Sequence, residues 1–367
     1  MRILHVLAAL DGGGVEVLLK NYYAHMDRDR FSFDFIVHGE RKGRLEDWFI
    51  QQGCGIYHVP PKGRNLAANL MRMKRAIRWG NYDVIHTHQG VMSAFPLMFA
   101  RECGIPMRIA HSHVAAVEKR KPMEWWLRRE VLEAATHYMA CSEEAAEWLF
   151  GQEIAGTNSC MILPNAINLK EFSWNPKERE RIRRDLALEG HFVIGTVARF
   201  TEQKNHKFLI EIGKRILERR PDAIFLLVGD GPLKERVWRQ AKAFGMEGQV
   251  RFMGNRDDVG ALMQAMDCFL LPSIYEGFGI VLLEAQASGL TCFTSAGVVP
   301  NGANVTGQVH YLDLNAGADT WAGEILKTYY PKRKDMTEQI AQAGYDIVRE
   351  AKRLEQYYAQ RRKGEEG

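Results

Sequence analysis

The sequence lacks the features of secreted, membrane-spanning and nucleic-acid-binding proteins. Its six cysteines are scattered without Cys-x-x-Cys spacing, which indicates a reduced compartment rather than a disulfide framework. The apolar run at the N-terminus ends at Asp11, too short to span a bilayer, and no other stretch reaches membrane-spanning length. The net charge of +4 is small for 367 residues, so nucleic acid is not an expected partner. We therefore expect a cytoplasmic protein.

Positive charge is concentrated in one sector, residues 62–129, with thirteen Lys and Arg against four acids. This sector suits an anionic membrane face, which would place the protein peripherally on the inner face of the cell membrane, or a phosphorylated substrate. Solvated helix faces are the alternative. Trp125 and Trp126 stand among its cations, an arrangement that suits a membrane interface or, equally, a buried aromatic pair under a basic helix.

Short apolar strands alternate with helical patterns along the chain. Strands are expected at residues 3–10, 31–39, 55–60, 82–88, 107–113 and 136–142, and again at 191–200, 223–231, 249–254, 268–273 and 290–295. Such alternation is typical of parallel βαβ units. The sequence therefore predicts an α/β protein with two doubly wound halves, whose ligands would bind in a cleft at the carboxyl ends of the strands.

The length also favours two domains, because single cores rarely grow this large. A stretch with two prolines and many charges, residues 163–190, separates the two strand series and indicates a linker. The predicted domains are 1–166 and 167–344. The charged amphipathic helix at about 345–367 is expected to pack back on the first domain.

Two turns at strand ends carry residues suited to anions. Gly12, Gly13 and Gly14 follow the first strand and open a helix, so backbone amides could approach an anion or a sugar oxygen, although a simple turn would also use glycine. Arg199 ends a buried strand and Lys204 follows five residues later. Two cations there suit a diphosphate, and an ordinary exposed loop is the alternative.

The segment PSIYEGFGIVLLEAQASG, residues 272–289, places two acids in an otherwise uncharged run. Burial of an unpaired carboxylate is costly, so these acids need partners. Gly277 and Gly279 would let amides at a helix start face a phosphate. Glu276 at the mouth could hold sugar hydroxyls, and Glu284 could accept hydrogen bonds from two ribose hydroxyls.

Possible metal ligands in the sequence are poorly spaced. His86 and His88 form a His-x-His pair without a third spaced ligand, and Asp27 and Asp29 lie in a polar turn. Arg199, Lys204 and the helix N-terminus would supply the positive charge of a divalent ion. We therefore expect no metal.

The chain resembles the retaining glycosyltransferases of family 4 over nearly its whole length. The resemblance rests on the glycine loop, LPNAINLKEF, the segment from Arg199 to Lys204, VGDGPL, VRFMG and above all EGFGIVLLEAQASG. RIAHSH and TSAGVVPNGANVT are most similar to bacterial exopolysaccharide and capsule transferases. The resemblance implies the GT-B fold, in which two Rossmann-like domains face across a cleft, the first binding the acceptor and the second the donor.

Donor contacts follow from the resemblance by position. It implies that Arg199 and Lys204 neutralise the diphosphate and that Glu284 binds the ribose. Glu276 would contact the donor sugar and the distal phosphate, together with the backbone of Gly277, Phe278 and Gly279.

Further roles are implied more loosely. Gly12 to Gly14 would face the diphosphate or the acceptor, and residues 251–254, with Gly254 at their end, would flank the base. His113, with His111 as second choice, would lie close to the donor sugar, and a structural histidine is the alternative. The loop at 296–308 departs from the family pattern because it carries no acid.

The expected activity is transfer of a sugar, with retention, from a UDP-sugar to a hydroxyl of a glycan or lipid-linked glycan in cell-surface polysaccharide synthesis. No cofactor beyond the nucleotide sugar is expected. A nucleotide-sugar epimerase on the same two-domain plan is the alternative. A dinucleotide-dependent dehydrogenase is disfavoured because the glycine spacing is not Gly-x-Gly-x-x-Gly, and a non-catalytic partner subunit would bind without turnover.

Overall fold

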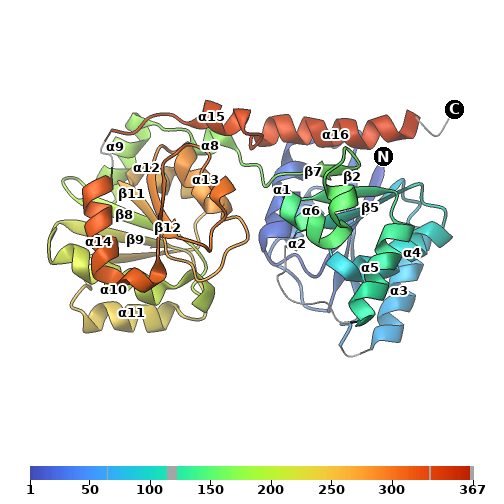
Figure 1. Cartoon of the computed structure of the whole chain (residues 1–367), viewed down its shortest axis with the longest axis horizontal. Helices are drawn as coiled ribbons and strands as arrows, with labels where there is room; N and C mark the ends of the chain where they lie inside the picture. The colour runs from blue at the N-terminus through green and yellow to red at the C-terminus, as the bar shows by residue number, and fades with distance from the viewer. Residues whose placement is uncertain (64, 114–121, 330–331, 364–367) are drawn as a thin grey trace. The chain divides into compact units, whose positions relative to one another are not determined.

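The computed structural model describes residues 1–63, 65–113, 122–329 and 332–363 (Figure 1). The chain forms two compact units, one made of Met1–Ala166 with Ile347–Gly367 and the other of Ile167–Asp346. Each unit is built on a parallel sheet, so the predicted α/β class with two doubly wound halves is confirmed. Among the described residues, every helix is too short or too polar to cross a bilayer.

The described strands of the first unit form a seven-stranded sheet in the order β3-β2-β1-β4-β5-β6-β7. Every pairing is parallel. The strands are β1 Arg2–Val6, β2 Ser32–His38, β3 Ile56–Val59, β4 Val84–Thr87, β5 Met107–Ser112, β6 His137–Ala140 and β7 Cys160–Ile162. Because the chain moves outward from β1 and later returns to β4 on its other side, the strand order reverses between β1 and β4.

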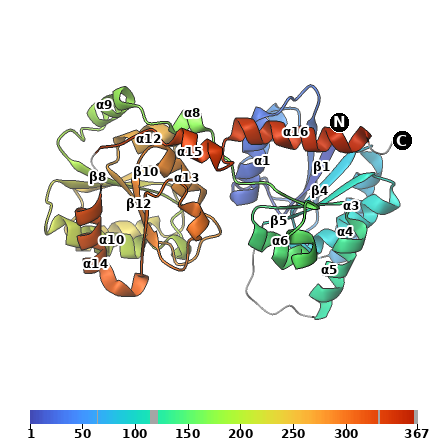
Figure 2. The ribbon, with the colours of Figure 1, turned by 45° about the horizontal axis from the view of Figure 1, so that its top comes forward.

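Helices cover both faces of this sheet. The helices are α1 Gly14–His25, α2 Glu46–Gln51, α3 Leu66–Trp79, α4 Ala94–Glu102, α5 Pro122–Ala134, α6 Glu143–Phe150, α7 Gln152–Ala155 and α16 Ile347–Lys363. Helices α1, α2 and α16 share one apolar core with the sheet, and α3 to α6 share the other. Leu354 and Tyr358 of α16 are buried beside α1, where Figures 1 and 2 show the two helices adjacent.

The described strands of the second unit form a six-stranded parallel sheet in the order β10-β9-β8-β11-β12-β13. The strands are β8 Phe192–Val197, β9 Ala223–Val228, β10 Val250–Gly254, β11 Cys268–Leu271, β12 Thr291–Ser295 and β13 Val309–Leu312. The order reverses between β8 and β11. This is the position at which open α/β sheets usually bind ligands.

The second sheet is also covered on both faces. The helices are α8 Leu169–Phe172, α9 Pro176–Asp185, α10 His206–Leu217, α11 Lys234–Ala243, α12 Val259–Ala265, α13 Ile280–Ala287, α14 Gly317–Thr328 and α15 Thr337–Gln342. One core lies under α8, α9, α12, α13 and α15, and the other lies under α10, α11 and α14.

Most of the stretch expected to be a linker belongs to the second unit. Leu169, Phe172 and Ile182 of α8 and α9 are buried in its core. α8 and α9 have few apolar residues among many charged ones. Their amphipathic pattern is therefore too weak to predict from sequence, and it is recognised only from the packing. The sequence also missed the edge strands β7 and β13, which have three and four residues with one fully buried residue each.

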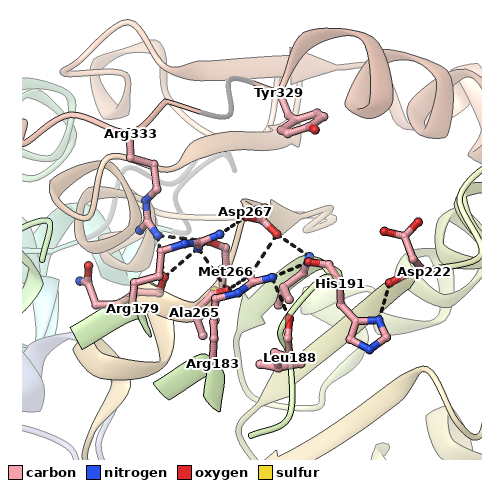
Figure 3. Close-up of polar contacts among 12 residues, drawn as sticks. Arg179, Arg183, Leu188, His191, Asp222, Ala265, Met266, Asp267, Tyr329 and Arg333 are labelled. Atoms are coloured by element: carbon pink, nitrogen blue, oxygen red, sulfur yellow. Dashed lines mark hydrogen bonds and ion pairs between the residues drawn. The ribbon is translucent and has the colours of Figure 1, made fainter. Parts of the chain in front are cut away.

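An arginine–aspartate cluster lies where the strands of the second sheet begin, and we call this end of the sheet its amino edge (Figure 3). We call Arg179, Arg183, Asp267 and Arg333 the amino-edge cluster. Both carboxylate oxygens of Asp267 face guanidinium groups, from Arg179 and Arg183. One of these oxygens also accepts a 2.7 Å hydrogen bond from the Val193 amide at the start of β8.

Arg333 stabilises the ends of two helices. Its guanidinium donates to the carbonyls that close α12 and α13, which belong to Met263, Gln264, Met266 and Ser288. Carbonyls in the last turn of a helix generally lack intrahelical donors, and a cation there also complements the helix dipole. Burial lowers the pKa of Arg333 to about 9. The cluster is therefore a structural brace.

Candidate functional site

The predicted donor residues follow the two strands at which the order of the second sheet reverses. Arg199 and Lys204 come after β8, and Glu276 and Glu284 come after β11. These strands are hydrogen-bonded neighbours, so their carboxyl ends place both segments at one edge. The sequence predicts each strand end, whereas the adjacency of the two strands comes from the tertiary fold.

Backbone and side-chain hydrogen bonds join the two loops. The Ile274 amide donates to the Gln203 carbonyl at 2.8 Å, and the Gln203 side-chain amide donates to the Tyr275 carbonyl at 3.0 Å. Lys204 Nζ forms an ion pair with Glu276 Oε2. The residues just before Lys204 and Glu276 are therefore bonded to each other, which brings the pair together.

The ion pair gives Glu276 the partner that the sequence left open for each of the two acids in the segment 272–289. The side chains of Lys204 and Glu276 are 18% and 10% exposed, so each charge is largely withdrawn from water and compensated by the other. The buried Ser273 hydroxyl donates a second hydrogen bond to Glu276 Oε2 at 3.2 Å. The sequence did not single out Ser273 or Gln203; the only available signal was the need of a buried carboxylate for donors.

Glu284 lies in the second turn of α13 and is partly buried. Burial, with a smaller contribution from the charge of Glu171, raises the pKa of Glu284 to about 7. The helix begins after Gly279, whose φ of +78° is in the left-handed region that favours glycine. Gly277 is exposed beside it. Glu284 and the amides at the N-terminus of α13 therefore lie within one short helix.

The other residues predicted to bind the donor lie at the same edge of the sheet, apart from the Lys204–Glu276 pair. Arg199 is exposed, and Gly254 ends β10 on the same edge. Phe278 stacks on Tyr345 with ring centroids 5.4 Å apart, which indicates a packing role for its side chain. Arg251 donates to the carbonyls of Leu186 and Ala187 after α9, so its guanidinium braces the fold.

The atypical loop at 296–308 is packed onto α13. Gln286 donates to the Ala303 carbonyl at 2.8 Å, and its side-chain oxygen accepts from the amide and hydroxyl of Thr306. Val299 and Ala303 are buried. The loop therefore fixes the position of the helix that carries Glu284, although it has no acid of its own.

In the first unit, the glycine loop lies where the strand order reverses. Gly12 has a φ of +92°, Gly13 caps α1 and Gly14 is its first residue. Gly12, Gly13 and Gly14 are exposed, and backbone amides at such a helix start can bind an anion.

Histidines from three strands gather at the same edge. We call this set the histidine cluster, and it comprises His5, His86, His88, His111 and His113. The rings of His111 and His113 are 3.9 Å apart, as expected for residues two apart on a strand. Burial lowers the pKa of His113 to about 3 and the pKa of His111 well below its usual value.

The basic sector exposes aromatic side chains. Trp125 and Trp126 of α5 are 59% and 48% exposed, which favours the surface interpretation over a buried pair. Trp79 of α3 is also exposed, and α3, α4 and α5 lie side by side in Figures 1 and 2. The cations at 64 and 119–121 lie outside the described residues. Asp27 and Asp29 are in an exposed turn after α1, as predicted.

Comparisons with known proteins match both units. The family described as "Glycosyl transferases group 1" matches residues 178–329, and the "Glycosyl transferase 4-like domain" matches residues 13–166. A protein of Bacillus subtilis (strain 168) named as glycosyltransferase EpsF is 33% identical over 357 residues, covering 94% of this chain and 93% of that protein.

A further relative and a solved structure are similar at lower identity. An Escherichia coli protein named UDP-Gal:alpha-D-GlcNAc-diphosphoundecaprenol alpha-1,3-galactosyltransferase is 26% identical over 309 residues, covering 80% of this chain and 79% of its own length. The crystal structure of Anabaena Alr3699/HepE in complex with UDP has a TM-score of 0.76 and 19% identity, covering 98% of this chain and all of that one. At that identity, the likeness concerns the fold.

Proposed function

This chain belongs to the group 1, family 4 glycosyltransferases of exopolysaccharide type, and on that premise we propose that its donor is a UDP-sugar. The family membership and the fold neighbours confirm a GT-B fold and a hexosyltransferase that moves sugar in polysaccharide biosynthesis. The proposed acceptor is a hydroxyl of a glycan or lipid-linked glycan, and the proposed reaction retains the anomeric configuration. It needs no cofactor beyond the nucleotide sugar.

The proposal is carried by the Lys204–Glu276 pair at the strand-order reversal of the second unit. A diphosphate would attract the Lys204 ammonium, and Glu276 would then be available to accept hydrogen bonds from donor-sugar hydroxyls. Arg199 is exposed and would supply a second cation. The amides of Gly277 and Gly279 at the start of α13 would add donors for the distal phosphate.

Leaving-group departure is the main physical task of such a reaction. Negative charge grows on the diphosphate while the sugar becomes oxocarbenium-like, and groups already in place stabilise this charge without reorganisation. In this proposal Lys204 and Arg199 act on the diphosphate in place of a metal ion. Glu284 accepts hydrogen bonds from the two ribose hydroxyls, which satisfy a carboxylate that is otherwise expensive to ionise.

The first unit is proposed to bind the acceptor. Its glycine loop, Gly12 to Gly14, would approach the diphosphate or the acceptor, and His113 would lie close to the donor sugar. His113 is half-buried and follows β5, whereas His111 is fully buried within that strand, so His113 is better placed to meet a ligand.

A lipid-linked acceptor would bring the enzyme to a membrane, and the surface of α3 and α5 suits that contact. Exposed Trp79, Trp125 and Trp126 lie on helices that also carry Arg75, Arg128 and other cations. We expect co-sedimentation with vesicles that contain an anionic lipid, and weaker binding after Trp125→Ser with Trp126→Ser. Equal binding of the double variant would contradict this contact.

A ligand screen tests the donor. UDP, UDP-glucose, UDP-galactose and GDP-mannose are each added to the full chain, and the shift in unfolding temperature is measured, since a ligand that binds the folded state raises it. UDP compounds should give the largest shift, and Lys204→Ala should abolish it. A shift from GDP-mannose alone would overturn the UDP assignment.

Product analysis separates transfer from epimerisation. Incubation with the identified UDP-sugar and an acceptor should release UDP and give a product whose new linkage keeps the donor's anomeric configuration by NMR. Isomerised UDP-sugar in the absence of acceptor would instead support the epimerase. Bound UDP-sugar without either product would support a non-catalytic subunit.

A further inference from the structure

A polar cluster at the carboxyl edge of the first sheet is not used by the proposed transfer reaction. It comprises Lys62, His38, Gln89 and Asn69, and we call it the Lys62 cluster. His38 ends β2, Lys62 follows β3 and Gln89 follows β4, so the parallel strands bring these three residues to one edge. Asn69 reaches them from the start of α3.

Hydrogen bonds join the four side chains in a row. Lys62 Nζ donates to Gln89 Oε1 at 2.7 Å, and Gln89 Nε2 lies 2.6 Å from His38 Nε2. On the other side of the ring, Asn69 Nδ2 lies 2.8 Å from His38 Nδ1 and also donates to the Pro60 carbonyl. The half-buried imidazole of His38 therefore lies between two amide nitrogens.

This arrangement of donors holds one hydrogen too many. A neutral imidazole has one N–H and one lone pair, so it accepts a hydrogen bond at only one nitrogen. Turning the Asn69 amide would place its oxygen against the Pro60 carbonyl, so His38 accepts from Asn69 at Nδ1 and carries its proton at Nε2. That N–H then opposes the amide nitrogen of Gln89.

The Gln89 amide cannot remove this conflict while the ammonium of Lys62 contacts it. If the amide turned, its oxygen would accept from His38, but its nitrogen would then oppose the Lys62 ammonium, which has no lone pair. An acceptor that drew Lys62 away would let the amide turn, and both the ammonium and the Gln89 N–H would then donate to that acceptor. The cluster therefore lacks a hydrogen-bond acceptor beside Lys62 and Gln89.

The charge of Lys62 also lacks a counter-ion. Within the described part of the chain, its half-buried ammonium bonds the neutral Gln89 side chain and no carboxylate. Burial lowers the pKa of Lys62 to about 8. Withdrawing an unpaired cation from water costs folding free energy, and such perturbed groups concentrate at sites that bind a ligand. The missing acceptor is therefore best supplied by an anion.

The cluster lies near the residue that the proposed reaction places beside the donor sugar. Gln89 directly follows His88, whose Nδ1 lies 2.8 Å from Nε2 of His113. The first unit is the one proposed to bind the acceptor. A glycan carried on a lipid is joined to it through a phosphate or diphosphate, and lysine is a common phosphate ligand.

We propose that Lys62 and Gln89 bind a phosphate group of the acceptor in the first unit. The ammonium supplies charge, the Gln89 amide adds a directed N–H, and His38 and Asn69 hold that amide from behind. The inference rests on the proposed function where it assigns the phosphate to an acceptor, but binding of the anion is measurable without sugar transfer.

Calorimetric titration with phosphate compounds tests the site. The full chain is first saturated with UDP, which occupies the donor site, and is then titrated with GlcNAc-1-phosphate, farnesyl diphosphate or the methyl glycoside of GlcNAc. Both phosphate compounds should bind, and the methyl glycoside should bind about tenfold more weakly or less, because it lacks the anion. Tighter binding of farnesyl diphosphate would identify a lipid linkage as the source of the phosphate, and tighter binding of GlcNAc-1-phosphate would identify a phosphorylated glycan.

Lys62→Met separates phosphate binding from folding. It removes the ammonium and keeps the length of the side chain, so the affinity for both phosphate compounds should fall about tenfold or more. The unfolding temperature of the free protein should stay equal or rise, because the variant no longer withdraws an unpaired charge from water. Lys74→Met is the matched control, since Lys74 on α3 is exposed and paired with Glu102, and it should change neither quantity.

Gln89→Glu tests the missing acceptor. A carboxylate at this position would accept from Lys62 and from the His38 N–H together, so the unfolding temperature should rise and phosphate binding should be lost. An unchanged unfolding temperature with retained phosphate binding would contradict the surplus of donors.

Three further outcomes overturn the proposal. A lower unfolding temperature in Lys62→Met with unchanged phosphate affinity would make the ammonium a structural group. Equal affinity for GlcNAc-1-phosphate and the methyl glycoside would show that the sugar, not the anion, is recognised. The third is the absence of binding of either phosphate compound to the wild-type chain, with circular dichroism as the check on folding.

Failure of the donor assignment is distinguishable from failure of this site. If UDP does not bind, the donor proposal fails, and the same titrations are made on Lys204→Ala, which lacks the lysine proposed to bind the donor diphosphate. Phosphate binding that persists in Lys204→Ala and is lost when Lys62→Met is added supports the site in the first unit. Binding that disappears in Lys204→Ala alone overturns it.

Discussion

The two edges of the second sheet carry similar charges but use them differently. At the amino edge, the oxygens of Asp267 meet two guanidinium groups and a backbone amide, and Arg333 donates to four carbonyls. At the carboxyl edge, Lys204 and Glu276 face each other, and Arg199 is exposed. The charged groups of the amino edge hold the fold together, whereas we propose that the cations and backbone amides of the carboxyl edge bind a ligand.

This difference shows why charge alone does not identify a site. The fold brings three arginines together around one aspartate, but their guanidinium groups are occupied by that carboxylate and by backbone carbonyls at helix ends. The carboxyl edge holds fewer charges. They lie where the strand order reverses, and parallel α/β sheets bind ligands at that position.

The largest effect is expected from a substitution that breaks the amino-edge cluster. Asp267→Asn removes the charge that both Arg179 and Arg183 face, so the free energy of unfolding should fall by about 3–5 kcal/mol. Chemical denaturation measures the loss. Glu178→Gln is the control, because its exposed pairing with Arg181 on α9 should contribute less than about 1 kcal/mol. Similar losses in both variants would contradict the structural role of the cluster.

The next largest effect is expected at the carboxyl edge, where a substitution should lower the turnover more than the stability. Lys204→Ala should lower kcat by about 10²–10³-fold, because it removes preorganised charge from the leaving diphosphate. Glu276 keeps the hydrogen bond from the Ser273 hydroxyl in this variant, whereas Asp267→Asn leaves two guanidinium groups facing no charge, so the free energy of unfolding should fall by less than in Asp267→Asn. Lys207→Ala, in an exposed pair on α10, should leave both quantities unchanged. Retained activity in Lys204→Ala would remove the basis of the proposed donor site.

A third test compares the two ends of α13. Gly279 and Gly289 have φ values of +78° and +69°, so alanine is strained at either position. At Gly289 a Cβ would also overlap the Lys334 carbonyl oxygen, and Gly289→Ala should cost about 2–3 kcal/mol of stability.

Gly279→Ala should cost only about 1–2 kcal/mol, since its nearest neighbour is a flexible Leu282 methyl at 3.3 Å. It should nevertheless weaken UDP binding more than Gly289→Ala does. Calorimetric titration with UDP checks this. The reverse order of binding losses would move the ligand away from the start of the helix.

The last test concerns pH and Glu284. In the unfolded chain this carboxyl loses its proton near pH 4.5, whereas in the fold the pKa is about 7. The folded state therefore binds the extra proton between these values, and stability falls as pH rises through that window. Denaturation at pH 4.5 to 8 should show a steeper fall in the wild type than in Glu284→Gln. Parallel curves would contradict the raised pKa.

Much of the fold was predictable because strands and helices have local periods. The expected strand at 3–10 overlaps β1, those at 191–200 and 268–273 contain β8 and β11, and the helix after Gly279 begins where the glycines indicate. The short edge strand β13 and the apolar residues of α8 were missed, because their burial depends on neighbours distant in sequence.

The candidate site was predictable in part. Glu276 and Lys204 stand out by residue type and position, although their ion pair needed the pairing of β8 with β11. Ser273 and Gln203 carry no distinctive local pattern. His86 and His88 lacked a third ligand in sequence spacing, and the neighbouring strand β5 brings His111 and His113 beside them.

By itself, the sequence determined the α/β class, the two strand series and the charged or glycine-rich turns that end particular strands. Each of these depends on residues close together along the chain. The tertiary structure alone decided which strand ends are neighbours. It therefore also decided which cations contact backbone carbonyls and which cations contact a carboxylate. The gathering of the histidines on one face of the first sheet has the same origin. Strand order in a parallel sheet is fixed by packing between distant segments, and local sequence periods do not encode it.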